Sequence, residues 1–128
     1  AIDTVWMCLS AFTPMIATMR ARTDNMRKAA AMGFINATDC SDYLVGKGIP
    51  FRDAYKIVGQ LVAECIAQNT TLEMLPLDEY KKVCSEFDEG IYEAISLDKC
   101  VADRIVYGGP SPSCVLAQVE RVRELIKK

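Results

Sequence analysis

The 128-residue sequence contains no histidine, no Cys-x-x-Cys pair and only one tryptophan. Histidine is both a common general base and a common zinc ligand, and the cysteines lack the spacing of a zinc site. No apolar run approaches the roughly 18 residues that suggest a membrane span. No secretory signal is recognisable either. These absences predict a cytoplasmic protein with no metal site and no membrane partner.

Charge is nearly balanced, with 15 basic and 17 acidic residues and a net charge of −2. Residues 1–32 are mildly basic, whereas residues 72–103 are acidic. No basic stripe with interleaved aromatics is present, so nucleic acid is not expected as a partner. The acidic stretch is interpreted as the solvated face of short helices rather than a binding surface.

The cysteines are widely spaced, at positions 8, 40, 65, 84, 100 and 114. Several lie on apolar faces, where a free thiol behaves as a small hydrophobic group. We therefore expect six free thiols. A thiol-based redox function would need a cysteine of low pKa beside positive charge. Only Cys100, near Lys99 and Arg104, offers such a setting.

Residues 2–31 carry an apolar face at helical spacing. Its members are Ile2, Val5, Trp6, Leu9, Phe12, Ile16 and Met19. Pro14 predicts a kink or break near residues 11–13, or a second helix start there. Five of the six methionines precede Gly33, which suggests a core shared with other subunits.

A second helix is expected after Asn36 or Thr38, either of which could cap it, and residues 46–48 should end it. Pro50 suits the first position of the next helix. That helix has the clearest apolar face, formed by Phe51, Ala54, Tyr55, Val58, Leu61, Val62, Cys65 and Ile66. Gly59 within it costs about 1 kcal/mol against alanine, and a close helix crossing would explain its presence.

The remaining sequence predicts a loop at residues 68–71, short helices at 77–83 and 87–95, and a further turn capped by Ser96. A turn at residues 107–110 leads to a last helix with Ser111 as cap and Pro112 at its first position. Its expected buried residues are Val115, Val119, Val122 and Ile126. The predicted fold is all-α: one long N-terminal helix followed by a small multi-helix C-terminal domain.

Several segments together resemble the start of the C-terminal domain of argininosuccinate lyases. They are Asn36–Asp39, Asp42–Val45, Lys47–Arg52 and Val58–Gly59. The likeness continues more weakly through residues 77–79, 87–92 and 104–112, although Pro110 stands where the family commonly has threonine. Residues 2–31 resemble the last long helix of the family's central bundle. The resemblance implies domains at residues 1–32, the end of that bundle, and 33–128, the C-terminal helical domain.

The family's signature loop, its Thr-His acid/base pair and its Gln-Glu-Asp-Lys segment, which helps bind substrate, are all missing from this sequence. The resemblance therefore implies the C-terminal part of a lyase that converts argininosuccinate to arginine and fumarate. It implies a structural role for this part, with no catalytic residue and no cofactor. The other subunits of a homotetramer would be its partners, and absent upstream segments would bind most of the substrate.

Some residues could still carry chemistry. Asp39 and Asp42 could form an acid/base pair, although capping of a helix start is the simpler interpretation. Lys47 and Arg52 could touch substrate or a neighbouring subunit, against surface solvation or a structural ion pair. Gly108–Gly109 could cradle a phosphate but more simply forms a turn.

Tyr43 and Tyr55 are interpreted as core residues whose hydroxyls reach water. An alternative function is a free-standing helical module that binds a partner helix. In either case, the apolar face of residues 2–31 predicts that this helix pairs with a second copy or folds back on its own domain.

Overall fold

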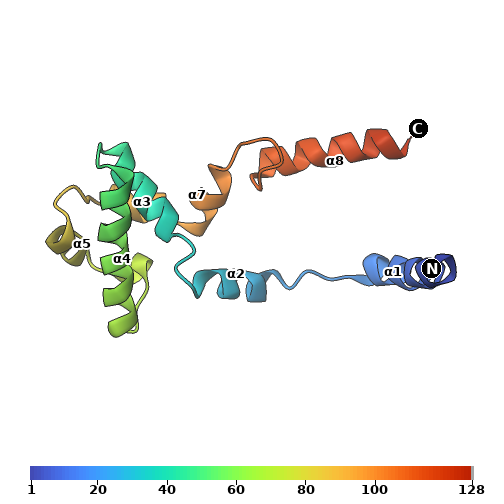
Figure 1. Cartoon of the computed structure of the whole chain (residues 1–128), viewed down its shortest axis with the longest axis horizontal. Coiled ribbons are helices and arrows are strands. Elements are labelled where there is room, and N and C mark those ends of the chain that lie inside the picture. The colour runs from blue at the N-terminus through green and yellow to red at the C-terminus, as the bar shows by residue number, and fades with distance from the viewer. Residues whose placement is uncertain (128) are drawn as a thin grey trace.

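The computed structural model describes residues 1–127, and every regular element in that range is helical (Figure 1). The α-helices are α1 (Ile2–Thr18), α2 (Thr23–Ala31), α3 (Ala37–Gly46), α4 (Phe51–Ala67), α5 (Leu77–Val83), α6 (Gly90–Ala94), α7 (Leu97–Ala102) and α8 (Pro112–Ile126). A 3₁₀ helix, η1 (Leu72–Met74), follows α4. The all-α prediction is confirmed.

The hydrophobic core is formed by residues from α3 through α6 in chain order. Within it, α3 packs along α4. Tyr80 and Phe87 are its largest fully buried side chains, and their ring centroids lie 4.9 Å apart. The Tyr80 hydroxyl donates a 2.8 Å hydrogen bond to the carbonyl of Leu72. This bond satisfies a buried polar group and ties η1 to α5.

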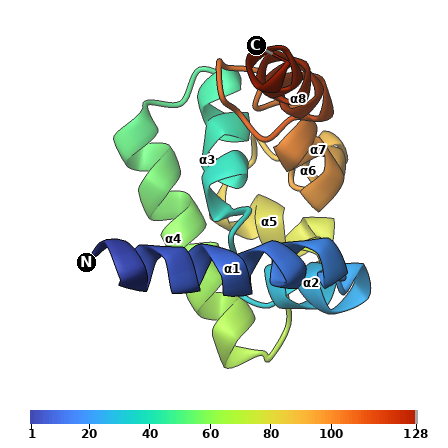
Figure 2. The ribbon, with the colours of Figure 1, turned by 90° about the vertical axis from the view of Figure 1, so that its right-hand side faces the viewer.

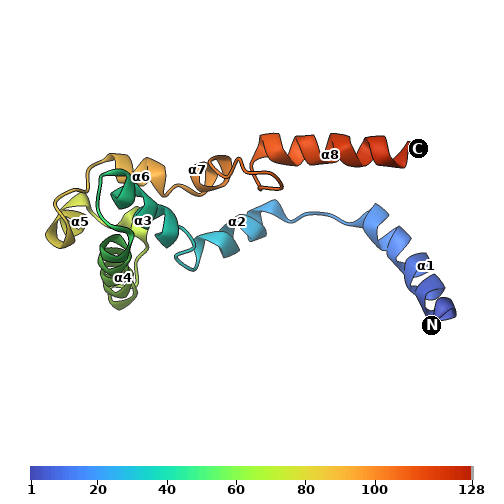
Figure 3. The same ribbon diagram turned by 45° about the horizontal axis from the view of Figure 1, so that its top comes forward.

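Two arms leave this core on the same side (Figures 1 and 3). One arm consists of α2 and then α1, and the other is α8. None of these three helices contains a buried residue. The prediction that α8 buries an apolar face is therefore wrong, because α8 projects away from the core and no element of residues 1–127 covers that face.

The expected helix at residues 2–31 is two helices. α1 continues through Pro14 and ends at Thr18, so the break predicted near residues 11–13 lies instead at residues 19–22. Thr18 donates a 2.8 Å hydrogen bond to the carbonyl of Pro14 in the last turn, and Met19 is extended. With no buried residue in α1 or α2, tertiary packing does not hold the chain helical across residues 19–22.

α1 and α2 meet at 91°. Figure 2 shows α1 crossing in front of the other elements, but Figure 3 places it at the far end of the arm from α4. α1 therefore does not fold back on its own domain, and of the two predicted alternatives only pairing with a second copy stays a prediction. Within residues 1–127 no single helix is long and apolar enough to cross a membrane; only α1 and α2 taken together reach that length and composition.

α3 and α4 differ in detail from their predicted starts. Asn36 occupies the N-cap position of α3, but neither its side chain nor that of Thr38 caps the helix, because the Asn36 amide is engaged elsewhere. Pro50 is the N-cap of α4 rather than its first residue. The predicted end of α3 is confirmed: Gly48 adopts a φ of +95°, which glycine reaches without strain.

α4 has two apolar stripes, and only one lies in the core. Ala54, Val58, Leu61 and Cys65 are buried, whereas Phe51, Tyr55 and Ile66 are exposed. The core role predicted for Tyr55 is therefore wrong. The close helix crossing predicted at Gly59 is also absent from this chain, because a Cβ added there would meet nothing within 4 Å.

The C-terminal elements follow the predicted capping. Ser96 accepts a hydrogen bond from the Lys99 amide at the start of α7, and Ser111 accepts one from the Cys114 amide at the start of α8. The helix expected at 87–95 begins at Gly90, after a turn. Short polar caps of this kind satisfy amides that a helix start leaves unpaired.

Candidate functional site

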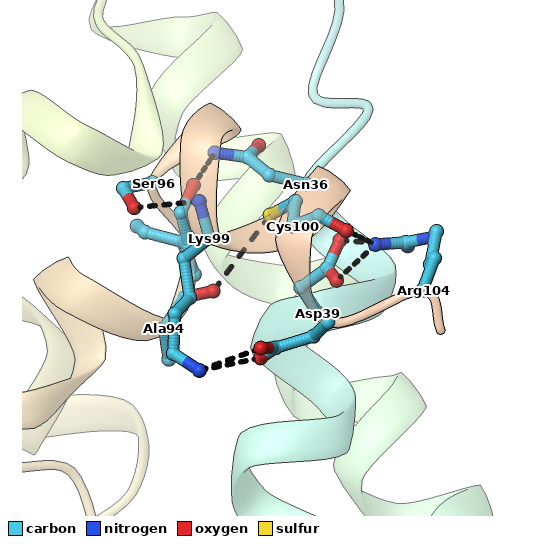
Figure 4. A network of polar contacts seen from close by, with 9 residues as sticks. Asn36, Asp39, Ala94, Ser96, Lys99, Cys100 and Arg104 are labelled. Carbon is cyan, nitrogen blue, oxygen red and sulfur yellow. Dashed lines mark hydrogen bonds and ion pairs between the residues drawn. The ribbon is translucent and has the colours of Figure 1, made fainter. Parts of the chain in front are cut away.

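Asp39 lies in the first turn of α3, and its carboxylate pairs with Arg104, just beyond α7 (Figure 4). The guanidinium donates two hydrogen bonds to it, at 2.9 and 3.2 Å, and a further one to the carbonyl of Cys100. The Asp39 side chain is 15% exposed and that of Arg104 is 42% exposed. The hydrogen bond to Asp39 raises the pKa of Arg104. A bidentate pair of this kind fixes geometry.

Asn36 provides a second link at the same place (Figure 4). Its amide nitrogen donates to the carbonyl of Ile95 at 3.0 Å and to the carboxylate of Glu73 at 2.7 Å. The residue is buried, so these bonds satisfy a polar group that would otherwise be costly to bury. Asn36 thus joins the start of α3 to η1 and to the end of α6.

Asp88 is the centre of another network, at the opposite end of α3. Its carboxylate accepts hydrogen bonds from the Tyr43 hydroxyl at 2.6 Å, from the Gly90 amide at 2.8 Å and from the Lys47 ammonium. The Lys47 bond, followed by those of Tyr43 and Gly90, holds the pKa of Asp88 well below its usual range. Lys47 is therefore a member of a structural ion pair, and the Tyr43 hydroxyl is bound to a carboxylate rather than to water.

The other predicted site residues are not brought together. Asp42 and Arg52 are both exposed, and neither forms a hydrogen bond or an ion pair with any side chain of residues 1–127. Asp39 faces Arg104 instead of Asp42. The suggested Asp39–Asp42 acid/base pair is therefore not formed, and helix capping, the simpler interpretation, does not describe Asp39 either.

The thiols of the described chain are unpaired, as expected. Burial raises the pKa of Cys100 to about 11 and that of Cys40 to about 12. The Cys100 thiol points to the carbonyl of Ala94 at 3.7 Å (Figure 4). A redox cysteine needs the opposite shift, so the setting of Cys100 contradicts the thiol-redox hypothesis.

The Gly108–Gly109 segment is a tight turn. Gly108 has a φ of +76°, and a Cβ at Gly109 would collide with the carbonyl oxygens of Arg104 and Val106. The Gly109 amide donates to the Val106 carbonyl at 2.8 Å. This amide is already used inside the turn and is not available to a phosphate. The segment is therefore the simple turn rather than a phosphate cradle.

An apolar groove of about 350 Å³ separates α3 from α4. Its lining includes the small residues Ala37, Ser41 and Gly59 and the aromatic residues Phe51 and Tyr55. We call it the α3–α4 groove. It contains no titratable carboxylate, lysine or arginine, so it suits an apolar side chain rather than acid/base chemistry.

The polar networks fasten segments together, and each joins residues far apart in the chain. Arg27 of α2 adds one more such link, donating twice to Asp98 of α7 at 2.9 Å. In residues 1–127 no group of three or more His, Cys, Asp or Glu side chains could hold a metal ion. Sequence periodicity could not reveal these pairs, since partners 37 to 71 residues apart leave no local pattern.

Comparison with known proteins finds one family and relatives that share its name. The family described as "Argininosuccinate lyase C-terminal" matches residues 34–102. An argininosuccinate lyase from Desulforamulus reducens is 50% identical over 128 residues, all of this chain and 28% of that protein. One from Lachnospira eligens is 54% identical over 112 residues, which is 88% of this chain and 24% of that protein. One from Clostridium botulinum is 51% identical over 126 residues, 98% of this chain and 27% of that protein.

Proposed function

Because the chain belongs to the argininosuccinate lyase C-terminal family, we propose that it is the C-terminal part of an argininosuccinate lyase with a structural and assembly role. The observation that carries this proposal is a sequence identity of about 50%, over nearly the whole chain, to proteins of that name. The chain spans only about a quarter of their length. The proposed parent reaction is reversible β-elimination of argininosuccinate to arginine and fumarate, in cytoplasmic arginine biosynthesis.

Such an elimination needs a base that removes a proton from the carbon next to a carboxylate, and an acid that protonates the departing guanidinium nitrogen. It also needs positive groups that stabilise the dianionic intermediate. Within residues 1–127, the charged residues that come together form ion pairs instead, either between neighbours three or four residues apart or between distant segments, as Asp39 does with Arg104. This supports placing the catalytic groups on the part of the parent enzyme that the chain does not span. The chain would then contribute helices to a homotetramer, without a metal or an organic cofactor.

The test is reconstitution of fumarate release, followed by ultraviolet absorbance with argininosuccinate as substrate. The chain alone, the upstream remainder of the Desulforamulus reducens relative alone, and the two mixed in equal amounts are compared. We expect release only from the mixture. Release by the chain alone would overturn the structural role and make Asp39, Asp42, Lys47 and Arg52 the first residues to mutate. An inactive mixture of two folded parts would contradict the assembly role.

The second candidate, a free-standing module that binds a partner helix, is favoured by one observation: α1 contains no buried residue. It is distinguished by the parent gene. An upstream reading frame that encodes the family's signature loop would support the lyase part, and its absence would support the module.

A further inference from the structure

Phe34 lies in the short segment between α2 and α3 (Figure 1), and its backbone is in the left-handed region. Its φ is +51°, which a residue with a Cβ adopts only at a cost in free energy. Gly33, the preceding residue, would tolerate this conformation, but the φ of Gly33 lies outside the left-handed region. The chain therefore places an aromatic residue, rather than the adjacent glycine, at the strained position.

The side chain of Phe34 explains how the strain persists. The ring packs against the hydrophobic core and lines the α3–α4 groove with Val58 and Val62 of α4. A strained backbone persists only where its surroundings determine the conformation, and packing of an aromatic ring stabilises it. The Phe34 carbonyl also accepts a 3.0 Å hydrogen bond from the Ala37 amide at the start of α3. Ring and carbonyl thus both fix Phe34 to the core.

The residues that follow Phe34 are fastened as well, but those that precede it are not. Asn36 is buried, and its amide donates to the carbonyl of Ile95 and to the carboxylate of Glu73. In contrast, no residue of α2 belongs to the hydrophobic core of residues 1–127. Phe34 is therefore the point at which the chain changes from the unburied α2 to the packed core.

An ion pair joins α2 to α7 beyond this point. Arg27 donates twice to Asp98, each time at 2.9 Å. The two side chains are 63% and 78% exposed, and an exposed ion pair contributes little because water and salt screen it. This pair alone is too weak to hold a helix in one direction.

We propose that Phe34 is an orienting joint: its left-handed backbone, fixed by its own ring, sets the direction in which α2 leaves the core. The Arg27–Asp98 pair only supports that direction. In the proposed lyase, α2 belongs to the end of the central bundle, so the joint would orient the C-terminal helices relative to that bundle. Only this last step rests on the proposed function, since the direction of α2 is measured without activity.

Residual dipolar couplings of backbone amides in the full chain test the joint, because they report the direction of each helix. We expect one alignment tensor to fit the couplings of α2, α3 and α4, and a strong NOE between the amide proton and Hα of Phe34, which marks a positive φ. In Phe34→Ala no ring holds the left-handed backbone, so the α2 couplings should shrink and lose the common fit. The matched controls are Met32→Ala, in the same segment, and Phe34→Tyr, which keeps the ring. Both should retain the common fit.

Arg27→Ala provides a second variant that leaves the core intact, because Arg27 lies on α2. We expect it to retain the common fit. Three results would overturn the joint. One is an original chain in which α2 shares no tensor with α3 and α4. Another is loss of the common fit in Arg27→Ala. The third is an unchanged common fit in Phe34→Ala, with amide shifts of α3 and α4 that show a folded core.

Failure of the joint and failure of the proposed function are distinguishable. An inactive mixture of the two folded parts would contradict the assembly role, yet it would leave the couplings of α2 in the chain alone unchanged. Loss of the common fit in Arg27→Ala would contradict the joint, whatever the mixture does in the fumarate assay.

Discussion

Arg104 and Asp39, separated by 65 residues in sequence, form a bidentate ion pair that joins the end of α7 to the first turn of α3. The same guanidinium donates to the Cys100 carbonyl, so it also satisfies a carbonyl in the last turn of α7. The pair lies at the point where the chain leaves the family-matched region and turns into α8. It therefore fastens the end of α7 to α3 shortly before the C-terminal arm begins.

Removal of Arg104 should destabilise the chain. Arg104→Ala leaves the mostly buried Asp39 carboxylate without its partner, and we expect a loss of roughly 1–2 kcal/mol, reduced from the fully buried case because Arg104 is partly exposed. Urea denaturation followed by circular dichroism measures it. The matched control is Arg123→Ala, which removes an exposed pair with Glu120 on α8 and should leave stability nearly unchanged. Equal effects of the two variants would contradict a special role for the Arg104 pair.

Acid should weaken the chain partly through Asp88. Its folded-state pKa is depressed below the ordinary value of 3.8, chiefly by Lys47. The stabilisation is therefore present above 3.8 and is lost as the pH falls from there toward the folded-state pKa. We expect Asp88→Asn to lower the melting temperature at neutral pH and to flatten its fall below pH 3.8. Glu86→Gln, which changes a neighbouring exposed side chain, serves as the control. If the melting temperature of Asp88→Asn falls below pH 3.8 as steeply as that of the original chain, Asp88 does not contribute to the acid sensitivity.

Thiol reactivity should divide the cysteines by position. Cys8 is exposed on α1, whereas burial raises the pKa of Cys40 to about 12 and that of Cys100 to about 11. Since the thiolate is the reactive form, labelling with a chromogenic disulfide at pH 8 should show a fast phase that Cys8→Ser removes. Cys40 and Cys100 should react only on addition of denaturant. Fast labelling of Cys100 in the folded chain would restore the redox hypothesis.

Two glycines should respond in opposite ways to alanine. Gly109→Ala places a methyl group against the carbonyl oxygens of Arg104 and Val106, and we expect a loss on the order of 1–3 kcal/mol. Gly46→Ala, at the end of α3, meets nothing within 4 Å and should stabilise by up to about 1 kcal/mol. Thermal denaturation of both compares them directly. A neutral Gly109→Ala would show that the turn relaxes at little cost.

Local chemistry made much of the fold predictable. The caps at Ser96 and Ser111, the glycine end of α3 and the positions of α4 and α8 all follow from residues close in sequence. The break after Thr18 could not be predicted in this way. Pro14 indicates a break near residues 11–13, but a proline within a helix can be accommodated at a cost, and α1 continues through it. The resemblance found in Asn36–Asp39 and Lys47–Arg52 lies within the region that the family matches.

The candidate site was much less predictable. Asp39 and Lys47 were singled out, but their partners Arg104 and Asp88 are set by the packing of distant helices. Burial of the α8 face and of Tyr55 was wrongly predicted because an apolar stripe shows that a face needs covering, not which chain covers it. That no residue here takes part in catalysis stays a prediction.

All buried side chains of residues 1–127 lie between Asn36 and Ser111. The cooperative unit that folds is therefore shorter than the chain, and α1 contributes nothing to its interior. Changes in α1 should therefore leave the folding equilibrium of the core almost untouched. The exposed residues of α1 are thus free to vary without cost to the stability of the folded unit.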